Sequence, residues 1–378
     1  MAPTGAFAPQ GGEDVRAGHL FTPGPVRIPK YILEIGARQT PYFRNEAFSA
    51  VVLECEQHLL DLAGAPPGSR VVFLTCSGTG AMEAAVTNLL APQDRAIVIN
   101  GGGFGQRFVD LCRHHEVAVL PYVPKVENMA DTGRLDHLAP AIPHASSSAR
   151  ALLVNGHETT TGVLYDLSAL GAFCRRHDLL FVVDAISMFL TDNINMTLQG
   201  IDSLIISSHK GLALPPGLSM VVLSPRAQDH LHPAGSPIYF DFASYLQDGL
   251  RGQTPFTPAV TILLQLQARL RMVATTGLAA EIERARRVAA YFRAAVERWP
   301  LAFASAFMPN AMTALTPTDG RKACDIVVEL ERGYDIHVAP NGGALRETVF
   351  RVAHMGEMTE VDMDELIHAL DHFFGRTA

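Results

Sequence analysis

Residues 201–223 read I-D-S-L-I-I-S-S-H-K-G-L-A-L-P-P-G-L-S-M-V-V-L and place one lysine between two short apolar runs. The runs, Ser203–Ile206 and Ser219–Leu223, are rich in Ile, Val and Leu, which favours buried β-strands. Small residues surround Lys210 directly after the first run, and a Pro-Pro-Gly turn precedes the second. The segment therefore predicts a strand that ends at a lysine-bearing loop, followed by a turn into another strand.

Short apolar runs also alternate with longer amphipathic stretches upstream, from residue 21 onward. Besides the two runs above, we expect strands at Arg70–Leu74, Ala96–Ile99, Val117–Pro121, Ala151–Val154 and Leu180–Val183. Helices are expected between them, at Ala81–Leu90, Gln106–His114 and Leu167–His177. This alternation predicts an α/β fold with a mainly parallel seven-stranded sheet and helices on both faces. Ligands of such sheets bind beyond the carboxyl ends of the strands.

The pattern changes after residue 250, where long amphipathic helices come first. The expected elements are helices at Val260–Thr276 and Leu278–Arg298, strands at Ala311–Leu315, Asp325–Glu329 and Thr348–Val352, and a closing helix at Thr359–Phe374. We place a domain boundary at Gly277, because the two long helices meet there. The chain is thus expected to have an N-terminal arm (1–20), a large domain (21–276) and a smaller C-terminal α+β domain (277–378).

Composition excludes several classes of protein. The 378 residues carry 30 basic and 38 acidic side chains, a net charge of −8, which argues against a nucleic-acid partner. The five cysteines form no C-x-x-C pair, which fits reduced thiols, and the fifteen histidines show no zinc spacing, so we expect no metal. We find no secretory signal and no apolar run of the ~20 residues that a membrane helix needs, so we expect a cytoplasmic protein without a membrane partner.

Two charged residues follow predicted strands and are candidates for chemistry. Lys210 could form a Schiff base with a carbonyl if its amine were partly desolvated, although most lysines are simply exposed. Asp184 ends the run F-V-V-D, where an unpaired buried carboxylate would be costly. It could pair with a protonated pyridine nitrogen and make that ring an electron sink, or it could cap a helix. These alternatives remain open for each residue taken alone.

Three further segments lie at predicted strand exits. Residues 75–83, T-C-S-G-T-G-A-M-E, would present free backbone N–H groups at a helix start, which suits a phosphate, but they match neither a P-loop nor a dinucleotide fingerprint. Residues 156–162, G-H-E-T-T-T-G, offer hydroxyls to a ring oxygen or form an ordinary polar turn. In residues 100–105, N-G-G-G-F-G, the aromatic side chain could stack on a flat ring or cap a core.

These five segments, in this order, resemble the class V aminotransferases, which have the type I fold of pyridoxal-phosphate enzymes. The resemblance extends from T-P-G-P at 22–25 to Arg351, nearly the whole chain. The most specific marks are D-A-I-S at 184–187 and S-H-K-G-L at 208–212, with the acid and the lysine 26 positions apart. Members of the family include alanine–glyoxylate, serine–glyoxylate, serine–pyruvate and 2-aminoethylphosphonate–pyruvate transaminases.

The resemblance implies a role for each matching residue. Lys210 would bind pyridoxal 5′-phosphate covalently and later carry the substrate Cα proton, and Asp184 would bind the pyridine N–H. Other cofactor contacts are implied for Ser77, Gly78, Thr79, Phe104, Thr159, Ile186, His209, Thr254 and Thr257. Substrate contacts are implied for Arg351, which would clamp the carboxylate, and for Gly24 and Pro25.

Some of these matches carry specific expectations. Thr257 corresponds to a threonine that reaches the phosphate across a dimer interface, so the resemblance implies a homodimer with active sites at the interface. Phe104 stands where relatives carry Trp or Tyr, which leaves it only ring packing. His209 stands where relatives often have Gln, and we expect it to contact the phosphate as an imidazolium.

The activity implied by the resemblance is transfer of an amino group from a small amino acid, such as alanine or serine, to a 2-oxo acid such as glyoxylate or pyruvate. A 2-aminoethylphosphonate donor is an alternative, because H-E-T-T-T-G and F-T-P are similar to that branch of the family. A lyase, an epimerase or a specialised biosynthetic enzyme is a further alternative, since one fold hosts many chemistries. A non-catalytic scaffold is disfavoured because Lys210 and Asp184 are both present.

Overall fold

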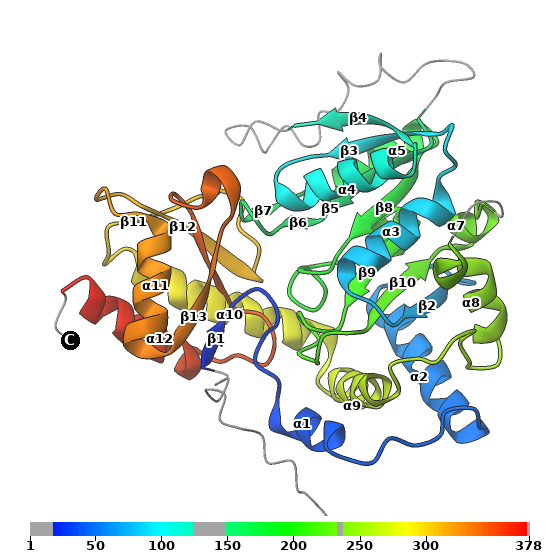
Figure 1. Cartoon of the computed structure of the whole chain (residues 1–378), viewed down its shortest axis with the longest axis horizontal. Coiled ribbons are helices and arrows are strands. Elements are labelled where there is room, and N and C mark those ends of the chain that lie inside the picture. The colour runs from blue at the N-terminus through cyan, green and yellow to red at the C-terminus, as the bar shows by residue number, and fades with distance from the viewer. Residues whose placement is uncertain (1–17, 124–148, 233–236, 376–378) are drawn as a thin grey trace, which may run out of the picture.

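A seven-stranded sheet forms the larger part of the computed structural model, which describes residues 18–123, 149–232 and 237–375 (Figure 1). Its strands run in the order β2-β10-β9-β8-β5-β3-β4. Their bounds are β2 (Arg70–Leu74), β3 (Arg95–Ile99), β4 (Ala118–Tyr122), β5 (Ala151–Asn155), β8 (Leu180–Asp184), β9 (Ser203–Ser207) and β10 (Ser219–Leu223). All pairings are parallel except those of β10, which is antiparallel to both neighbours. The expected mainly parallel sheet is confirmed.

The helices cover both faces of this sheet because alternate strand residues point to opposite sides. On one face, Phe73, Val154 and Ile206 pack with α2 (Glu46–Leu62), α5 (Leu167–Arg176) and α9 (Val260–Thr276). On the other face, their neighbours Leu74, Leu153 and Ile205 pack with α3 (Gly78–Leu89), α4 (Gly103–His114) and α8 (Phe242–Gly249). Shorter elements of this part include the helices α1 (Lys30–Gly36), α6 (Met196–Gln199) and α7 (Pro225–Asp229) and a hairpin of β6 (His157–Glu158) and β7 (Val163–Leu164).

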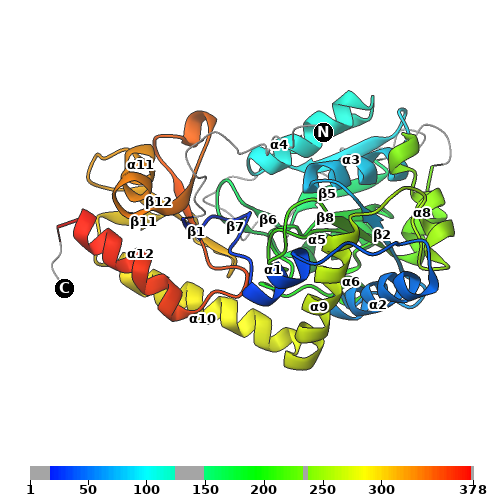
Figure 2. The same ribbon diagram turned by 60° about the horizontal axis from the view of Figure 1, so that its bottom comes forward.

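A second, five-stranded sheet has the order β1-β13-β14-β12-β11. Its strands are β1 (His19–Phe21), β11 (Leu301–Phe303), β12 (Met312–Pro317), β13 (Ile336–Pro340) and β14 (Phe350–Ala353). Three helices belong to this part: α10 (Leu278–Val296), α11 (Ala323–Tyr334) and α12 (Glu360–Phe373). Figure 2 shows α10 leading from the end of α9 to a position beside α12. The apolar core here is separate from those of the large sheet, and β1 contributes Phe21 to it.

The sequence-based bounds differ from the structure in instructive ways. All seven expected strands of the large sheet are present, with ends shifted by one residue at most. Helices α3 and α4 begin three residues earlier than expected, at Gly78 and Gly103. The sequence pattern predicts that each helix starts at its first periodic apolar residue. A helix can begin earlier, because the N–H groups of its first turn have no partner within the helix and the residues there need not pack in the core. Of the expected arm at 1–20, residues 1–17 lie outside the described part.

One predicted element is wrong. Residues 325–329, expected as a strand, lie inside helix α11. The run D-I-V-V-E is rich in β-branched residues, which favours a strand over five residues. Over the longer window, however, the buried residues are Ala323, Ile326, Val327 and Leu330, the spacing of one helical face. Packing of that face against the core of the five-stranded sheet therefore outweighs the local preference. The start of α12 agrees with expectation, since Thr359 and Asp362 form a capping box.

Candidate active site

The carboxyl ends of five strands of the large sheet surround one cavity of about 110 Å³. Loops that follow β2, β3, β5, β8 and β9 each contribute to its wall. Nine of the residues singled out in the sequence line it: Ser77, Gly78, Thr79, Phe104, Thr159, Asp184, Ile186, His209 and Lys210. Met82, Arg107 and Ser187 complete the lining. A topology in which successive parallel strands end at one edge thus brings together segments more than 130 positions apart in the sequence.

Lys210 is buried in this cavity, with 8% of its surface exposed, so it is not an exposed loop lysine. Burial lowers the pKa of its amine from 10.5 to about 8, while the nearby Asp184 carboxylate acts in the opposite direction and the guanidinium groups of Arg351 and Arg107 lower it further. The Nζ donates a hydrogen bond to the carbonyl oxygen of Pro23. An amine with this pKa is partly neutral near pH 8, and only the neutral amine is a nucleophile.

The N-terminal segment passes directly over the lysine at Gly24. A Cβ at this position would lie 2.5 Å from Cδ and 2.7 Å from Nζ of Lys210, and the residue has φ +121°. Both the backbone conformation and the close approach require glycine here. Gly24 is therefore brought to the site as expected from the sequence, and Pro25 follows it in the chain.

Asp184 is the last residue of β8 and is 6% exposed. Burial raises the pKa of its carboxyl group to about 6, although hydrogen bonds from the Ile186 N–H and from the Asn155 amide, as well as Lys210, lower it. The N–H of Ile186 lies 2.8 Å from Oδ1, and the Asn155 Nδ2 lies 2.5 Å from Oδ2. No helix starts at this point, so the helix-cap alternative is wrong. The carboxylate stays ionised above pH 6 and is fixed in place for a cationic partner.

The start of helix α3 forms part of the cavity wall and offers an anion-binding site there. Ser77 is its N-cap residue, but the hydroxyl makes no cap hydrogen bond and remains free for a ligand. A Cβ at Gly78 would lie 2.4 Å from the end of the Ile186 side chain, so the glycine gives that side chain room beside the backbone. The hydroxyl of Thr79 accepts a hydrogen bond of 3.0 Å from Arg107. Free N–H groups, the positive end of the helix dipole and one arginine suit a phosphate.

His209 borders the same wall, and its Nδ1 is buried without a hydrogen-bond partner in the described part of the chain. Burial lowers the pKa of the imidazole to about 4, and the Lys210 amine adds to that effect. The ring is therefore neutral at pH 7 in this structure, and the imidazolium expected beside a phosphate stays a prediction. An orphaned polar atom beside the α3 start fits an additional ligand group.

Arg107 and Glu158 are two residues of this region that the sequence analysis missed. The Arg107 guanidinium lies over the Phe104 ring, 4.8 Å from its centroid, in a cation–π contact that holds the ring at the cavity. The fully buried Glu158 carboxylate accepts hydrogen bonds from the N–H groups of Phe104 and Gly105 at 3.4 and 2.9 Å. The signals were present, since Arg107 is one helical turn from Phe104 and Glu158 lies within H-E-T-T-T-G.

Arg351 reaches the site from the second sheet. Its Nη1 donates to the carbonyl oxygen of Thr159 at 3.1 Å, and its Nη2 donates to that of Pro340. Its Nε is buried and has no hydrogen-bond partner among the described residues. Burial lowers the pKa of the guanidinium to about 10, while Glu158 opposes the shift, so the group stays cationic. The Thr159 hydroxyl itself donates to the hydroxyl of Ser187 at 3.0 Å. Arg351 therefore places a positive charge beside the loop that carries Thr159.

Five predicted residues are absent from the cavity lining: Thr254, Thr257, Arg351, Gly24 and Pro25. Gly24 and Arg351 still lie against lining residues, Lys210 and Thr159 respectively, whereas Thr254 and Thr257 make no such contact within the described part of the chain. Thr254 is buried, and its hydroxyl donates to the carbonyl oxygen of Phe256 at 2.6 Å. Thr257 is exposed, and neither residue lines the cavity.

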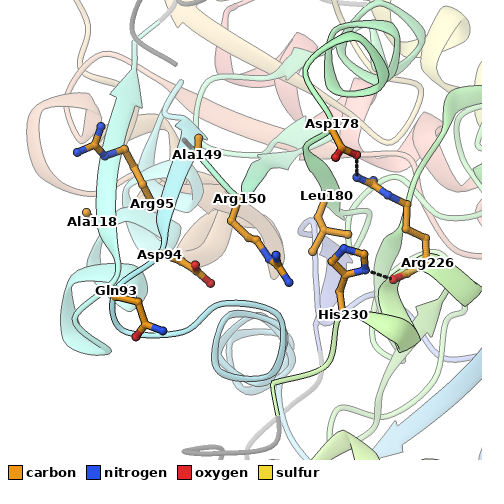
Figure 3. Close-up of a pocket in the computed structure, with 10 residues that line it drawn as sticks. All are labelled: Gln93, Asp94, Arg95, Ala118, Ala149, Arg150, Asp178, Leu180, Arg226 and His230. Carbon is orange, nitrogen blue, oxygen red and sulfur yellow. Dashed lines mark hydrogen bonds and ion pairs between the residues drawn. The ribbon is translucent and has the colours of Figure 1, made fainter. Parts of the chain in front are cut away.

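Another cavity, of about 410 Å³, lies at the opposite, amino-terminal edge of the sheet (Figure 3). Figure 3 shows Arg150 pointing into it and Arg226 paired with Asp178 beside His230. None of the segments singled out in the sequence reaches this edge, and neither Lys210 nor Asp184 lines it. The smaller cavity is therefore the candidate active site.

The described residues contain neither a candidate metal site nor a membrane-spanning helix. Within the described ranges, His, Cys, Asp and Glu side chains nowhere gather in the groups of three that could hold a metal ion. No helix in that part of the chain combines the length and the apolar character needed to cross a lipid bilayer.

Comparison with known proteins gives consistent results. Residues 36–342 match the family Aminotransferase class-V. The chain is 31% identical to a soluble hydrogenase 42 kDa subunit of Anabaena cylindrica over 93% of this chain and 92% of that protein. It is 29% identical to a serine–glyoxylate aminotransferase of Arabidopsis thaliana, over 91% of this chain and 87% of the relative.

Among solved structures, an aspartate aminotransferase of subgroup IV from Thermus thermophilus is 29% identical and superposes with a TM-score of 0.83. The superposition covers 94% of this chain and 99% of that one. The likeness therefore includes both sheets and the helices between them.

Proposed function

Because the chain belongs to the class-V aminotransferase family and is thus a pyridoxal-phosphate-dependent enzyme, we propose that it transfers the amino group of a small amino acid, serine or alanine, to glyoxylate or pyruvate. The observation that carries this proposal is the cavity itself, where one buried lysine amine and one buried carboxylate share a wall with a helix start suited to phosphate. The 29% identity to a serine–glyoxylate aminotransferase supports the choice of substrates.

The cavity residues fit the cofactor by their chemistry. The ionised carboxylate of Asp184 would hold the proton of the pyridine nitrogen, and Phe104 would pack on the ring. The free Ser77 hydroxyl and the N–H groups at Gly78 and Thr79 would bind the phosphate. Three further contacts are proposed: His209 through its unpartnered ring nitrogen to the phosphate, Thr159 to the phenolic oxygen, and Ile186 to the ring.

When bound, pyridoxal phosphate supplies the electron sink that makes loss of the substrate Cα proton possible. Lys210 then acts as the base that removes this proton and as the acid that returns it, and its lowered pKa suits both roles near neutral pH. Arg351 would pair with the substrate carboxylate, for which its planar fork is suited. Gly24 and Pro25 would close the cavity over the substrate, and the close approach of Gly24 to the lysine supports this role.

A spectroscopic screen tests the proposal. The purified enzyme, loaded with pyridoxal phosphate, is mixed with single amino acids, and conversion to the pyridoxamine form is followed by absorbance. Serine and alanine should react, and glyoxylate or pyruvate should reverse the change. A 2-aminoethylphosphonate or aspartate donor that reacts faster than both would replace the proposed substrates. Lys210→Ala is the control that should lose the visible band, and absence of reaction with any donor would contradict transamination.

We propose further that the enzyme is a homodimer in which Thr254 and Thr257 complete the partner's site. Both threonines lie outside the cavity of their own chain. Exposed apolar side chains lie in the segments next to Thr254. Tyr42, 68% exposed, is two residues before Arg44, which donates to the Thr254 carbonyl oxygen, and Leu53, 42% exposed, lines a cavity with Arg44 and Gln253. Leu250, 72% exposed, precedes Thr254 by four positions. Exposed patches of this kind mark protein–protein interfaces.

Subunit complementation tests the shared site. Lys210→Ala and Thr257→Ala homodimers should each be nearly inactive. After unfolding and refolding together in equal amounts, half of the dimers are mixed and each mixed dimer has one intact site, so about a quarter of wild-type activity should return. No gain on mixing, or a monomer on sizing chromatography, would contradict the shared site.

The proposal includes the domain division at Gly277 and a cytoplasmic location. Gly277 separates α9 from α10 with φ +88°, and a Cβ there would meet nothing within 4 Å, which supports a boundary at this residue. The large and small sheets also have separate cores. All five cysteines are free thiols, which supports a reducing compartment.

A further inference from the structure

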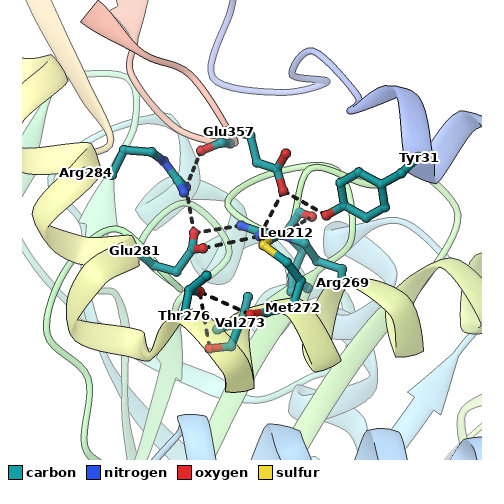
Figure 4. Close-up of polar contacts among 10 residues, drawn as sticks. Tyr31, Leu212, Arg269, Met272, Val273, Thr276, Glu281, Arg284 and Glu357 are labelled. Carbon is teal, nitrogen blue, oxygen red and sulfur yellow. Dashed lines mark hydrogen bonds and ion pairs between the residues drawn. The ribbon is translucent and has the colours of Figure 1, made fainter.

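A network of charged side chains lies where α9 passes into α10, next to Leu212 in the loop that follows Lys210 (Figure 4). Its centre is Arg269, the largest fully buried side chain in the described part of the chain, with 0% of its surface exposed. Two hydrogen bonds join its guanidinium to Glu281, with Nη2 to Oε2 at 2.7 Å and Nη1 to Oε1 at 3.3 Å. Glu281 is itself 1% exposed and also accepts a bond of 2.6 Å from Arg284.

The remaining donors of Arg269 are directed to the segments that surround Lys210. The Nε donates to the carbonyl oxygen of Leu212 at 3.2 Å, two residues after the lysine. The Leu212 loop is tight, because the N–H of Ala213 donates to the carbonyl oxygen of Lys210 at 2.8 Å. A bond from Arg269 to Leu212 therefore fixes the backbone that carries the lysine.

A second donor reaches the segment after strand β14, on which Arg351 lies. The Nη1 of Arg269 donates to Glu357 at 3.1 Å. Arg284 reinforces this contact by donating to the carbonyl oxygen of Gly356 at 2.6 Å. The guanidinium thus connects the lysine loop to the strand of the proposed substrate arginine.

The third connection runs to the N-terminal segment through Glu357. The same oxygen of Glu357 accepts a bond of 2.8 Å from the hydroxyl of Tyr31 in α1. Upstream of Tyr31, Pro23 accepts the bond from Lys210, and Gly24 lies against the lysine side chain. Three segments that are distant in sequence therefore meet at one buried cation.

Stability alone does not account for this arrangement. Two charges lose their hydration when they are buried, and apolar side chains of similar volume are often as stable. A guanidinium has donors in several directions within one rigid plane, whereas lysine has a single flexible ammonium. The directions used here lead to the lysine loop and to the Arg351 strand, which is what positioning requires.

We propose that Arg269 is a positioning residue for transamination, holding the lysine loop, the N-terminal segment and the Arg351 strand in register around the reacting groups. This inference rests on the proposed role of Lys210 as the reactive amine. It extends the functional residues to a side chain that does not line the cavity.

The position of Lys210 has a direct readout in the pKa of its amine. The titratable groups that act on this amine are Asp184, Arg351 and Arg107, and the neighbouring rings of His157 and His209. None of these side chains belongs to the Arg269 network, so an Arg269 variant keeps all of their charges and changes only where the amine lies relative to them and to solvent. A lysine loop that relaxes toward water should regain a higher pKa, because burial is the largest cause of its lowering.

The test compares Arg269→Lys with Arg271→Lys, a matched control on the same helix whose side chain is 60% exposed and paired with Glu54. The full chain without added cofactor is labelled with acetic anhydride across a pH series, and the extent of labelling at Lys210 is measured by mass spectrometry. Wild type and control should show a midpoint near 8. For Arg269→Lys we expect a rise of about one unit, which lowers labelling at pH 8 about fivefold, and a fall in kcat of about tenfold or more.

An unchanged midpoint in a folded Arg269→Lys protein would overturn the proposal. If that variant does not fold, Glu357→Ala decides. It leaves the buried Arg269–Glu281 pair and the bonds to Leu212 and Gly356 intact, but it removes the carboxylate that joins Arg269 to Tyr31 and so to the N-terminal segment at Lys210. A midpoint equal to that of wild type then refutes the positioning role, and a rise supports it. The labelling needs no turnover, so its result is independent of whether the donor screen succeeds.

Discussion

Lys210 should make the cofactor-free protein less stable at neutral pH, and the cost follows from its burial. The pKa of the amine falls from 10.5 to about 8 on folding, so the folded chain disfavours the charged form. At 1.36 kcal/mol per unit, this shift of about 2.5 units (10.5 − 8) corresponds to about 3 kcal/mol. The unfolded chain binds more protons between pH 8 and 10.5, and the free energy of unfolding therefore rises with pH across that window.

We expect Lys210→Met to gain about 3 kcal/mol of unfolding free energy at pH 7, because no buried amine has to be charged. It also loses the hydrogen bond to Pro23, which contributes about 1 kcal/mol. The net gain in unfolding free energy is about 2 kcal/mol at pH 7. At pH 10.5 and above the gain disappears and the variant is about 1 kcal/mol less stable than wild type. Methionine fills a similar volume, so packing changes little.

Urea unfolding of both proteins without cofactor, at several pH values from 7 to 11, measures the difference. Lys30→Met, in which the replaced side chain is 91% exposed, is the control and should show no pH-dependent difference. A Lys210→Met difference that stays constant with pH, or a variant that is less stable than wild type at pH 7, would refute the argument that burial sets this pKa.

Three further predictions concern the same cavity. Asp184→Asn should lower kcat by about a hundredfold or more, since no charge remains to hold a ring proton, and an active variant would contradict the role. The same variant should have a higher melting temperature at pH 7, because the buried carboxylate, with its pKa raised to about 6, no longer has to be ionised. Gly24→Ala should reduce kcat strongly while the protein still folds, because the added Cβ would displace the Lys210 side chain. If the amino donor still converts the cofactor to its pyridoxamine form at the normal rate, the segment does not constrain the lysine. Arg107→Met should weaken cofactor binding about tenfold in equilibrium titrations, whereas the exposed Arg113→Met on the same helix should bind normally.

Much of the cavity could be predicted because its residues lie at strand ends. A run such as F-V-V-D fixes both the strand and the position of its last side chain, and parallel strands bring their ends to one edge. Lys210, Asp184 and the start of α3 are therefore close together for reasons that the sequence displays. The family resemblance added the roles, which periodicity alone does not supply.

Other features depend on contacts that local patterns do not encode. Residues 325–329 favour a strand over five positions, and only the face formed by the whole of α11 shows that they are helical. The charge of His209 depends on its burial, which lowers the pKa of the imidazole, and the local sequence does not show that burial. Arg269 lies within an ordinary amphipathic pattern, and nothing in V-T-I-L-L-Q-L-Q-A-R-L-R-M distinguishes it from the exposed Arg271 two positions later.

Comparing Arg269 with Arg271 also shows how the fold keeps the lysine loop in place although burial of the charged groups destabilises the site. Lys210 and Asp184 are both buried against their preferred charge states, and each lowers the stability of the cofactor-free protein at pH 7. A loop that carries such an amine tends to open toward water unless its backbone is held. Arg269 holds this loop through its hydrogen bond to the carbonyl oxygen of Leu212. Because Glu281 neutralises the guanidinium, Arg269 adds little net positive charge near the Lys210 amine. An exposed arginine cannot do the same, since a surface ion pair contributes only about 0–1 kcal/mol and makes no contact with the loop.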